Sequence, residues 1–204
     1  MTVADETVDK LPVVLFRNAR EWERWLAKHH TEPEGLWLRI AKKNSGLDSV
    51  SYAEALDSAL CWGWIDGLKR SYDEATWIQK FTPRRKRSMW SKVNQGKVEA
   101  LIAEGRMQPA GLAEIERAKA DGRWDAAYDS FSSAEPSEDF QAALDASPEA
   151  AAAFAALNRQ NRYSFIVRVQ MVRRADTRAR KIAEFIAMLE RGETIGPGRS
   201  ANGQ

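Results

Sequence analysis

The chain has 204 residues, 44% of them hydrophobic and 29% charged, with a formal net charge of +2 at pH 7. This length suits one compact domain or two small lobes, and the hydrophobic share is large enough for a packed core. The single cysteine excludes an internal disulfide and a cysteine-based zinc site.

No apolar run approaches the roughly 20 residues that a membrane helix requires. The acidic N-terminus also lacks the basic and apolar regions of a signal peptide. We therefore expect a cytoplasmic protein without membrane insertion.

The first half of the chain mixes strand and helix patterns. Alternating hydrophobic and polar residues predict strands at residues 13–16, 36–42, 64–72 and 75–81. Hydrophobic residues three to four apart predict helices at residues 19–29, 51–61, 91–104 and 110–120. Capping patterns at Asn18-x-x-Glu21 and Ser51-x-x-Glu54 support the first two helices. Asp73 and Glu74 lie between the last two strands and predict a hairpin.

The second half carries helix patterns without a strand signal, at residues 137–145, from 147, at 160–173 and at 177–191. The sequence therefore predicts an α+β fold, with a small antiparallel sheet and packed helices over residues 12–122 and an all-helical part over 123–192. Residues 1–11 and 193–204 are predicted to be flexible tails. No long linker separates the two parts, which is also compatible with one continuous domain.

Charge is unevenly distributed along the chain. Residues 77–98 hold seven Lys or Arg and no acid, and residues 158–181 hold eight against the single acid Asp176. Residues 124–158 hold seven acids and no Lys or Arg. These blocks either solvate the chain or pack near one another, or the two basic blocks converge on an anionic partner.

The first candidate site is the sequence from Trp62 to Gly67, WGWIDG, in which a helix leads into a strand. In strand phase Trp64 and Asp66 share one face. Either the tryptophans are core residues and Asp66 accepts hydrogen bonds in a turn, or Asp66 lies at the rim of an aromatic pocket. In the second case it is a hydrogen-bond acceptor or a general base.

The second candidate site is the basic loop FTPRRKRSMWSKVN at residues 81–94. A helix N-terminus beside guanidinium groups suits phosphate or carboxylate. The alternative is a solvated loop with a buried tryptophan. The predicted ligand-binding residues of both sites together are Trp62, Trp64, Asp66, Arg84, Arg85, Arg87, Trp90, Ser91 and Asn94.

The other reactive side chains favour neither a metal nor a cofactor site. His29 and His30 are the only histidines, and neighbours cannot share one helix face. Burial beside Leu60 and Trp62 would make Cys61 inert. The chain has no glycine-rich phosphate loop, zinc motif or nucleophile elbow. We expect no metal and no cofactor.

Three segments resemble the YdeI/OmpD-associated family, whose members are often labelled bacteriocin-protection proteins. They are SYAEALDSALCWGWIDG, FTPRRKRSMWSKVN and FAALNRQNRYSFIVRVQMVRRADTRARKIAEFIAML, which span most of residues 36–191. The resemblance implies an α+β N-terminal part and a helical C-terminal part in a bacterial cytoplasmic protein. It implies no particular reaction and no catalytic residues.

Three functions remain open from the sequence. The leading hypothesis is a non-catalytic protein that binds an anionic small molecule, in a stress or bacteriocin-tolerance role. The second is a small-molecule enzyme with Asp66 as base and Arg84 or Arg85 as electrostatic stabiliser. The third is a nonspecific nucleic-acid binder, which the low net charge disfavours.

Overall fold

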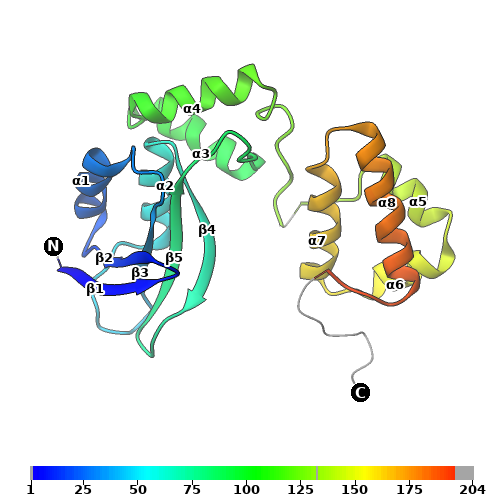
Figure 1. Ribbon diagram of the computed structural model, residues 1–204, viewed down its shortest axis with the longest axis horizontal. Helices are drawn as coiled ribbons and strands as arrows, with labels where there is room; N and C mark the ends of the chain where they lie inside the picture. Colours follow the sequence, from blue (N-terminus) through cyan, green and yellow to red (C-terminus); the bar gives the residue numbers. More distant parts are fainter. Residues whose placement is uncertain (1, 132, 196–204) are drawn as a thin grey trace. The chain divides into compact units, whose positions relative to one another are not determined.

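A computed structural model describes residues 2–131 and 133–195 of the chain (Figure 1). The chain divides into two compact units. The N-terminal unit comprises residues 1–88 and 94–124, and the C-terminal unit comprises residues 89–93 and 125–204. Residues 89–93 fall within the predicted N-terminal part at 12–122, but in the structure they belong to the C-terminal unit.

The N-terminal unit is built on a five-stranded sheet in the order β1-β2-β3-β5-β4. Its strands are β1 (Thr2–Val8), β2 (Leu11–Leu15), β3 (Leu36–Ala41), β4 (Trp64–Ser71) and β5 (Thr76–Pro83). β2 and β3 pair in parallel, because helix α1 (Ala19–His29) connects them. The other neighbours pair antiparallel. The predicted α+β class is confirmed, but the sheet is mixed at the β2–β3 pair rather than wholly antiparallel.

Strand β1 stands where the sequence predicted a flexible tail. It pairs with β2 through a tight turn in which Asp9 and Lys10 both have positive φ, 50° and 66°. Two such residues form the turn that matches the twist of a hairpin. The indole Nε1 of Trp37 donates to the carbonyl of Val8 at 3.0 Å and ties β1 to the sheet. The turn lacks the Asn-Gly or Asp-Gly pair that would have signalled it in the sequence.

Two helices, α1 and α2 (Tyr52–Cys61), pack together on one face of the sheet (Figure 1). Trp22 of α1 is fully buried, with its ring 5.7 Å from that of Phe81 on β5 and 6.2 Å from that of Trp64 on β4. Its Nε1 donates to the carbonyl of Ala55 at 3.0 Å, which joins α1 to α2. The alternation of β3 places Leu36, Leu38 and Ile40 in this core.

Helices α3 (Lys92–Ala103) and α4 (Pro109–Ala120) complete the first half of the chain. Helix α4 packs against the end of α2 through a glycine. A Cβ at Gly111 would lie 2.2 Å from the carbonyl oxygen of Cys61, so only glycine permits this approach. The contact places the segment that precedes α4 beside the end of α2.

The C-terminal unit contains the helices α5 (Glu138–Asp145), α6 (Pro148–Ala156), α7 (Arg159–Gln170) and α8 (Ala175–Glu190). Aromatic rings meet edge-to-face in its core, with the rings of Phe165 and Phe185 5.0 Å apart. The core cluster consists of Phe140, Leu144, Ala150, Phe165, Val169, Ile182, Phe185, Leu189 and Ile195. No strand occurs among the described residues from 137 to 191, as predicted. Of the C-terminal tail predicted at residues 193–204, residues 196–204 lie outside the described part of the chain.

Candidate functional site

A polar groove of about 470 Å³ lies in the N-terminal unit, beside the end of α2. Helix α1 forms one wall and presents Arg20, Arg24 and Glu23 to it. Arg20 and Arg24 are four residues apart, so they project from the same helix face. The side chain of Asn18 caps this helix by accepting from the backbone N–H of Glu21 at 3.1 Å, which sets where the helix begins.

The second wall is the end of α2, where Cys61 and Trp62 meet the groove. Gly63 follows with φ of 75° and turns the chain into β4. The ring of Trp62 lies 4.7 Å from that of His30 and is half-buried. The groove therefore has an indole surface beside its arginines, which suits stacking of a guanidinium or of a planar ligand.

The third wall is the connection between α3 and α4, which contributes Arg106 and Gln108. Gly105, with φ of 67°, ends α3 in a Schellman motif: its N–H donates to the carbonyl of Ile102, and that of Arg106 donates to Leu101. The backbone N–H of Gln108 donates to the carbonyl of Cys61 at 3.1 Å. These bonds hold Arg106 against the groove although it follows a helix end.

The groove carries more positive than negative charge. Glu23 accepts from the hydroxyl of Ser58 at 3.0 Å and lies 3.8 Å from Arg106. Arg106 also reaches Glu104 at 3.3 Å. Among the residues that the structure describes, no carboxylate lies within ion-pair distance of Arg20 or Arg24. Three arginines and one glutamate thus share one concave surface.

Cys61 is buried in this wall, and its chemistry follows from that burial. Desolvation raises the pKa of the thiol to about 11, although the nearby Arg106 acts in the opposite direction. The thiolate is the reactive form of cysteine, so the thiol is a weak nucleophile at neutral pH. The groove therefore offers guanidinium and indole groups for binding.

The residues of the first predicted site, Trp62, Trp64 and Asp66, lie in different surroundings in the structure. Trp64 is fully buried, and its Nε1 donates to the carbonyl of His30 at 2.8 Å. Asp66 is half-buried and accepts from the hydroxyl of Tyr52 at 2.8 Å. Of the nine predicted ligand-binding residues, Trp62 is the one that lines the polar groove.

The second predicted site is divided between interior and surface. Arg84 is only 5% exposed, and its backbone N–H donates to the carbonyl of Gly63 at 3.0 Å. Arg85 and Arg87 are exposed on the loop. Asp66 pairs with Phe81 in the sheet. Arg84 follows Phe81 by three residues, which is about 10 Å along an extended chain.

The remaining predicted residues are at the start of α3. Trp90 and Ser91 are buried, and the carbonyl of Trp90 accepts from the backbone N–H of Tyr128 at 3.0 Å within the C-terminal unit. Asn94 is also buried but belongs to the N-terminal unit. These three residues are therefore buried and belong to two different units.

Sequence reasoning missed the arginines of the groove. Arg20 and Arg24 have a detectable signal, since they are four residues apart on a predicted amphipathic helix. Arg106 is an isolated arginine after a glycine. It lies near Arg20 and Arg24 only because α4 packs on α2. The basic run at residues 84–87 is the more conspicuous pattern, so the anion-binding site was predicted there and not on α1.

Two family models match different parts of the chain. Residues 133–192 match the family described as "Bacteriocin-protection, YdeI or OmpD-Associated". The resemblance expected from the sequence is therefore confirmed for the segment that contains α5 to α8. Residues 14–114, which hold the other two segments of that resemblance, match a domain of unknown function, DUF8412. The YdeI/OmpD-associated match thus covers only part of the chain.

Neither the curated proteins nor the solved structures contain a match to this chain. Within the described residues, no helix is both long enough and apolar enough to cross a membrane. No group of three or more His, Cys, Asp or Glu side chains in the same residues is arranged to hold a metal ion.

Proposed function

We propose that the protein binds an anionic small molecule without transforming it, in the groove between α1, the end of α2 and the α3–α4 connection. The observation that carries this proposal is the convergence of Arg20, Arg24 and Arg106 beside the half-buried indole of Trp62. The site differs from the loop at Arg84 to Arg87 that the sequence favoured. The class of ligand is the same.

The physical basis is the excess of guanidinium over carboxylate in a concave site. Guanidinium groups form paired, charge-assisted hydrogen bonds with phosphate or carboxylate. Arg106 has acidic neighbours that orient it, whereas Arg20 and Arg24 have none within ion-pair distance in the described part of the chain. An incoming anion would therefore meet two arginines that no carboxylate of the described residues pairs with.

Isothermal titration with inorganic phosphate, pyrophosphate and citrate tests this proposal. We expect at least one of these anions to bind, and we expect Arg20→Gln with Arg24→Gln to weaken that binding at least about tenfold, since each lost charge-assisted bond contributes about 1.5–3 kcal/mol. Raising the salt concentration should weaken binding as well, because both arginines are exposed.

The matched control is Arg85→Gln with Arg87→Gln, which removes the same charge from the exposed loop. This variant should bind the anion as the unmodified chain does. Loss of binding in the loop variant alone would show that the anion binds at the loop predicted from the sequence and not in the groove. Absence of binding to all three anions would overturn the proposal.

We further propose that this binding serves a stress or bacteriocin-tolerance role in a bacterial cytoplasm. The support is the match of residues 133–192 to the bacteriocin-protection family. The test is survival of a sensitive bacterial strain under bacteriocin challenge while it produces the chain. We expect increased survival, and loss of that increase in the Arg20→Gln, Arg24→Gln variant. Unchanged survival with the intact chain would contradict the role.

A further inference from the structure

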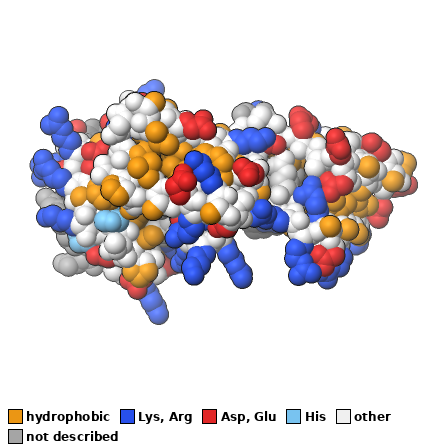
Figure 2. Space-filling model, turned by 90° about the horizontal axis from the view of Figure 1, so that it is seen from above, with side chains coloured by type: hydrophobic (Ala, Val, Ile, Leu, Met, Phe, Trp, Pro, Cys, Tyr) orange, Lys and Arg blue, Asp and Glu red, His pale blue; other side chains and the backbone are white. Residues whose placement is uncertain are grey.

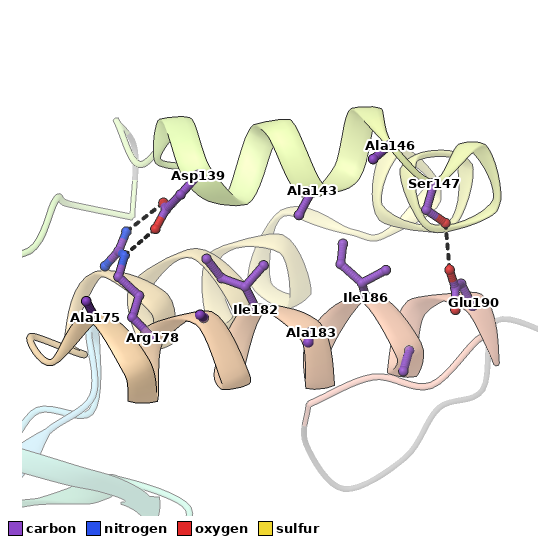
Figure 3. Close-up of a pocket in the computed structure, with 12 residues that line it drawn as sticks. Asp139, Ala143, Ala146, Ser147, Ala175, Arg178, Ile182, Ala183, Ile186 and Glu190 are labelled. Carbon is purple, nitrogen blue, oxygen red and sulfur yellow. Dashed lines mark hydrogen bonds and ion pairs between the residues drawn. The ribbon is translucent and has the colours of Figure 1, made fainter.

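A second groove, of about 630 Å³, runs along the C-terminal unit between α5 and α8 (Figure 3). Its floor is apolar: Ile182 and Ile186 of α8 point up toward Ala143 of α5. The exposed rim of α8 consists of small side chains one turn apart, at Ala175, Ala179 and Ala183. Small side chains let the backbone of another helix approach closely.

Polar bridges close the two ends of this groove. Arg178 of α8 holds Asp139 of α5 at 2.5 and 2.9 Å at one end. At the other end the hydroxyl of Ser147 donates to Glu190 at 2.7 Å. The bridges fix α5 and α8 along the length of the groove, so the apolar surface between them is preformed.

Helix α8 has an uneven distribution of charge along its axis. Its first half and the residue before it carry four basic residues and one acid, which are Arg174, Arg178, Arg180, Lys181 and Asp176. Its second half and the residue after it carry two acids and one basic residue, which are Glu184, Glu190 and Arg191, and Arg191 pairs with Glu193 at 2.8 Å. A copy of this helix that runs antiparallel would place basic residues opposite acidic ones, whereas a parallel copy would place like charges together.

We propose that this groove is a homodimer interface, in which the α8 helices of two chains cross antiparallel beside Ala183. A two-fold axis makes each copy contribute the same surface, so the charge asymmetry of α8 becomes complementary to itself. A crossing centred at the level of Ile182 places Arg180 of one copy opposite Glu184 of the other, where Glu184 also pairs with Lys181 of its own helix at 2.7 Å. Arg180 is exposed and has Thr177 as its hydrogen-bond partner on α8, at 3.5 Å.

Sedimentation equilibrium of the full chain over a range of concentrations tests the interface. We expect a monomer–dimer equilibrium for the unmodified chain. Ala183→Glu should weaken dimerisation at least about tenfold, because it places two carboxylates in an apolar contact. The matched control is Ala152→Glu, the same change at an exposed alanine of α6, which should leave the equilibrium as it was.

A charge exchange tests the antiparallel direction. Arg180→Glu should weaken the dimer, and the addition of Glu184→Arg in the same chain should restore much of the affinity, because opposite charges again face each other. Circular dichroism of each variant establishes that the helices are intact. A chain that remains monomeric up to about 100 μM, or a dimer equally stable in all the variants, overturns the proposal. The anion titration uses different residues, so either proposal can fail alone.

Discussion

The carboxylate of Asp66 takes part in a long-range hydrogen bond. The hydroxyl of Tyr52, the first residue of α2, donates to its carboxylate at 2.8 Å. Tyr52 is 37% exposed and Asp66 half-buried, so the bond lies at the margin of the core. Because it joins the start of α2 to β4, it favours the structural interpretation of Asp66 over that of a general base.

We predict that Tyr52→Phe and Asp66→Ala each lower the free energy of unfolding by about 1 kcal/mol, the typical net contribution of one hydrogen bond. The double variant should lose little more than either single variant, because both changes remove the same bond. Urea denaturation of the four proteins measures the coupling. Additive losses would show that the two side chains contribute independently, and would contradict the structural role of the bond.

Arg178 holds three elements of the C-terminal unit together. Its guanidinium donates to the carboxylate of Asp139 on α5 and, at 2.7 Å, to the carbonyl of Val169 near the end of α7. It also donates to the hydroxyl of Ser137 at 2.7 Å. A single arginine of α8 therefore caps the last turn of α7 and fixes the start of α5.

This arrangement makes the stability of the unit depend on pH. The hydrogen bonds from Arg178 hold the pKa of the Asp139 carboxyl well below its usual value of 3.8, although partial desolvation opposes them. The unfolded chain takes up the proton first as the pH falls. The stabilisation is therefore fully present above about pH 4 and is lost progressively below it.

We predict that Asp139→Asn lowers the free energy of unfolding at pH 7 by about 1 kcal/mol or less, since the carboxylate is half exposed and screened by solvent. The difference between the variant and the unmodified chain should shrink as the pH falls from 5 to 2. Urea denaturation across this range measures it. Glu138→Gln is the matched control, because it removes a neighbouring carboxylate from the first turn of the same helix. A difference that is constant with pH would contradict the assignment.

Both units neutralise much of their own charge. In the N-terminal unit Lys97 pairs with Asp57 at 2.7 Å, and in the C-terminal unit Lys92 pairs with Asp129 at 2.6 Å. Lys181 pairs with Glu184 at 2.7 Å. On the face drawn in Figure 2, basic and acidic side chains both occur across the surface. A polyanion would have to compete with these internal carboxylates.

We therefore predict no binding to duplex DNA tighter than roughly micromolar at physiological salt, which is the nonspecific range. Fluorescence anisotropy with labelled duplex and single-stranded DNA over a salt series measures it. Submicromolar affinity that falls steeply with salt and disappears in an Arg85→Ala, Arg87→Ala variant would contradict the prediction. It would make nucleic-acid binding through the basic loop the leading function.

Structural features that depend on neighbouring residues could be predicted from the sequence. The Ser51 and Glu54 pair predicted the capping box at the start of α2, and both of its hydrogen bonds are present. Pro148 and the side chain of Ser147 begin α6 as expected. The periodicity of residues 177–191 predicted helix α8, in which Ile182, Phe185 and Leu189 are buried. Each of these features is set by bonds within one or two turns, so the local sequence contains the whole cause.

Features that join distant segments needed the tertiary structure. The parallel pairing of β2 with β3 follows from the path of α1. Strand β1 is held by its pairing with β2 and by Trp37, although its own sequence predicts a strand only weakly. Arg106 reaches the groove of Arg20 and Arg24 because glycine at position 111 lets α4 lie against Cys61. These contacts join segments that are far apart in the sequence, so no repeating pattern of neighbouring residues predicts them. Which side chains meet is decided by how the elements pack in three dimensions.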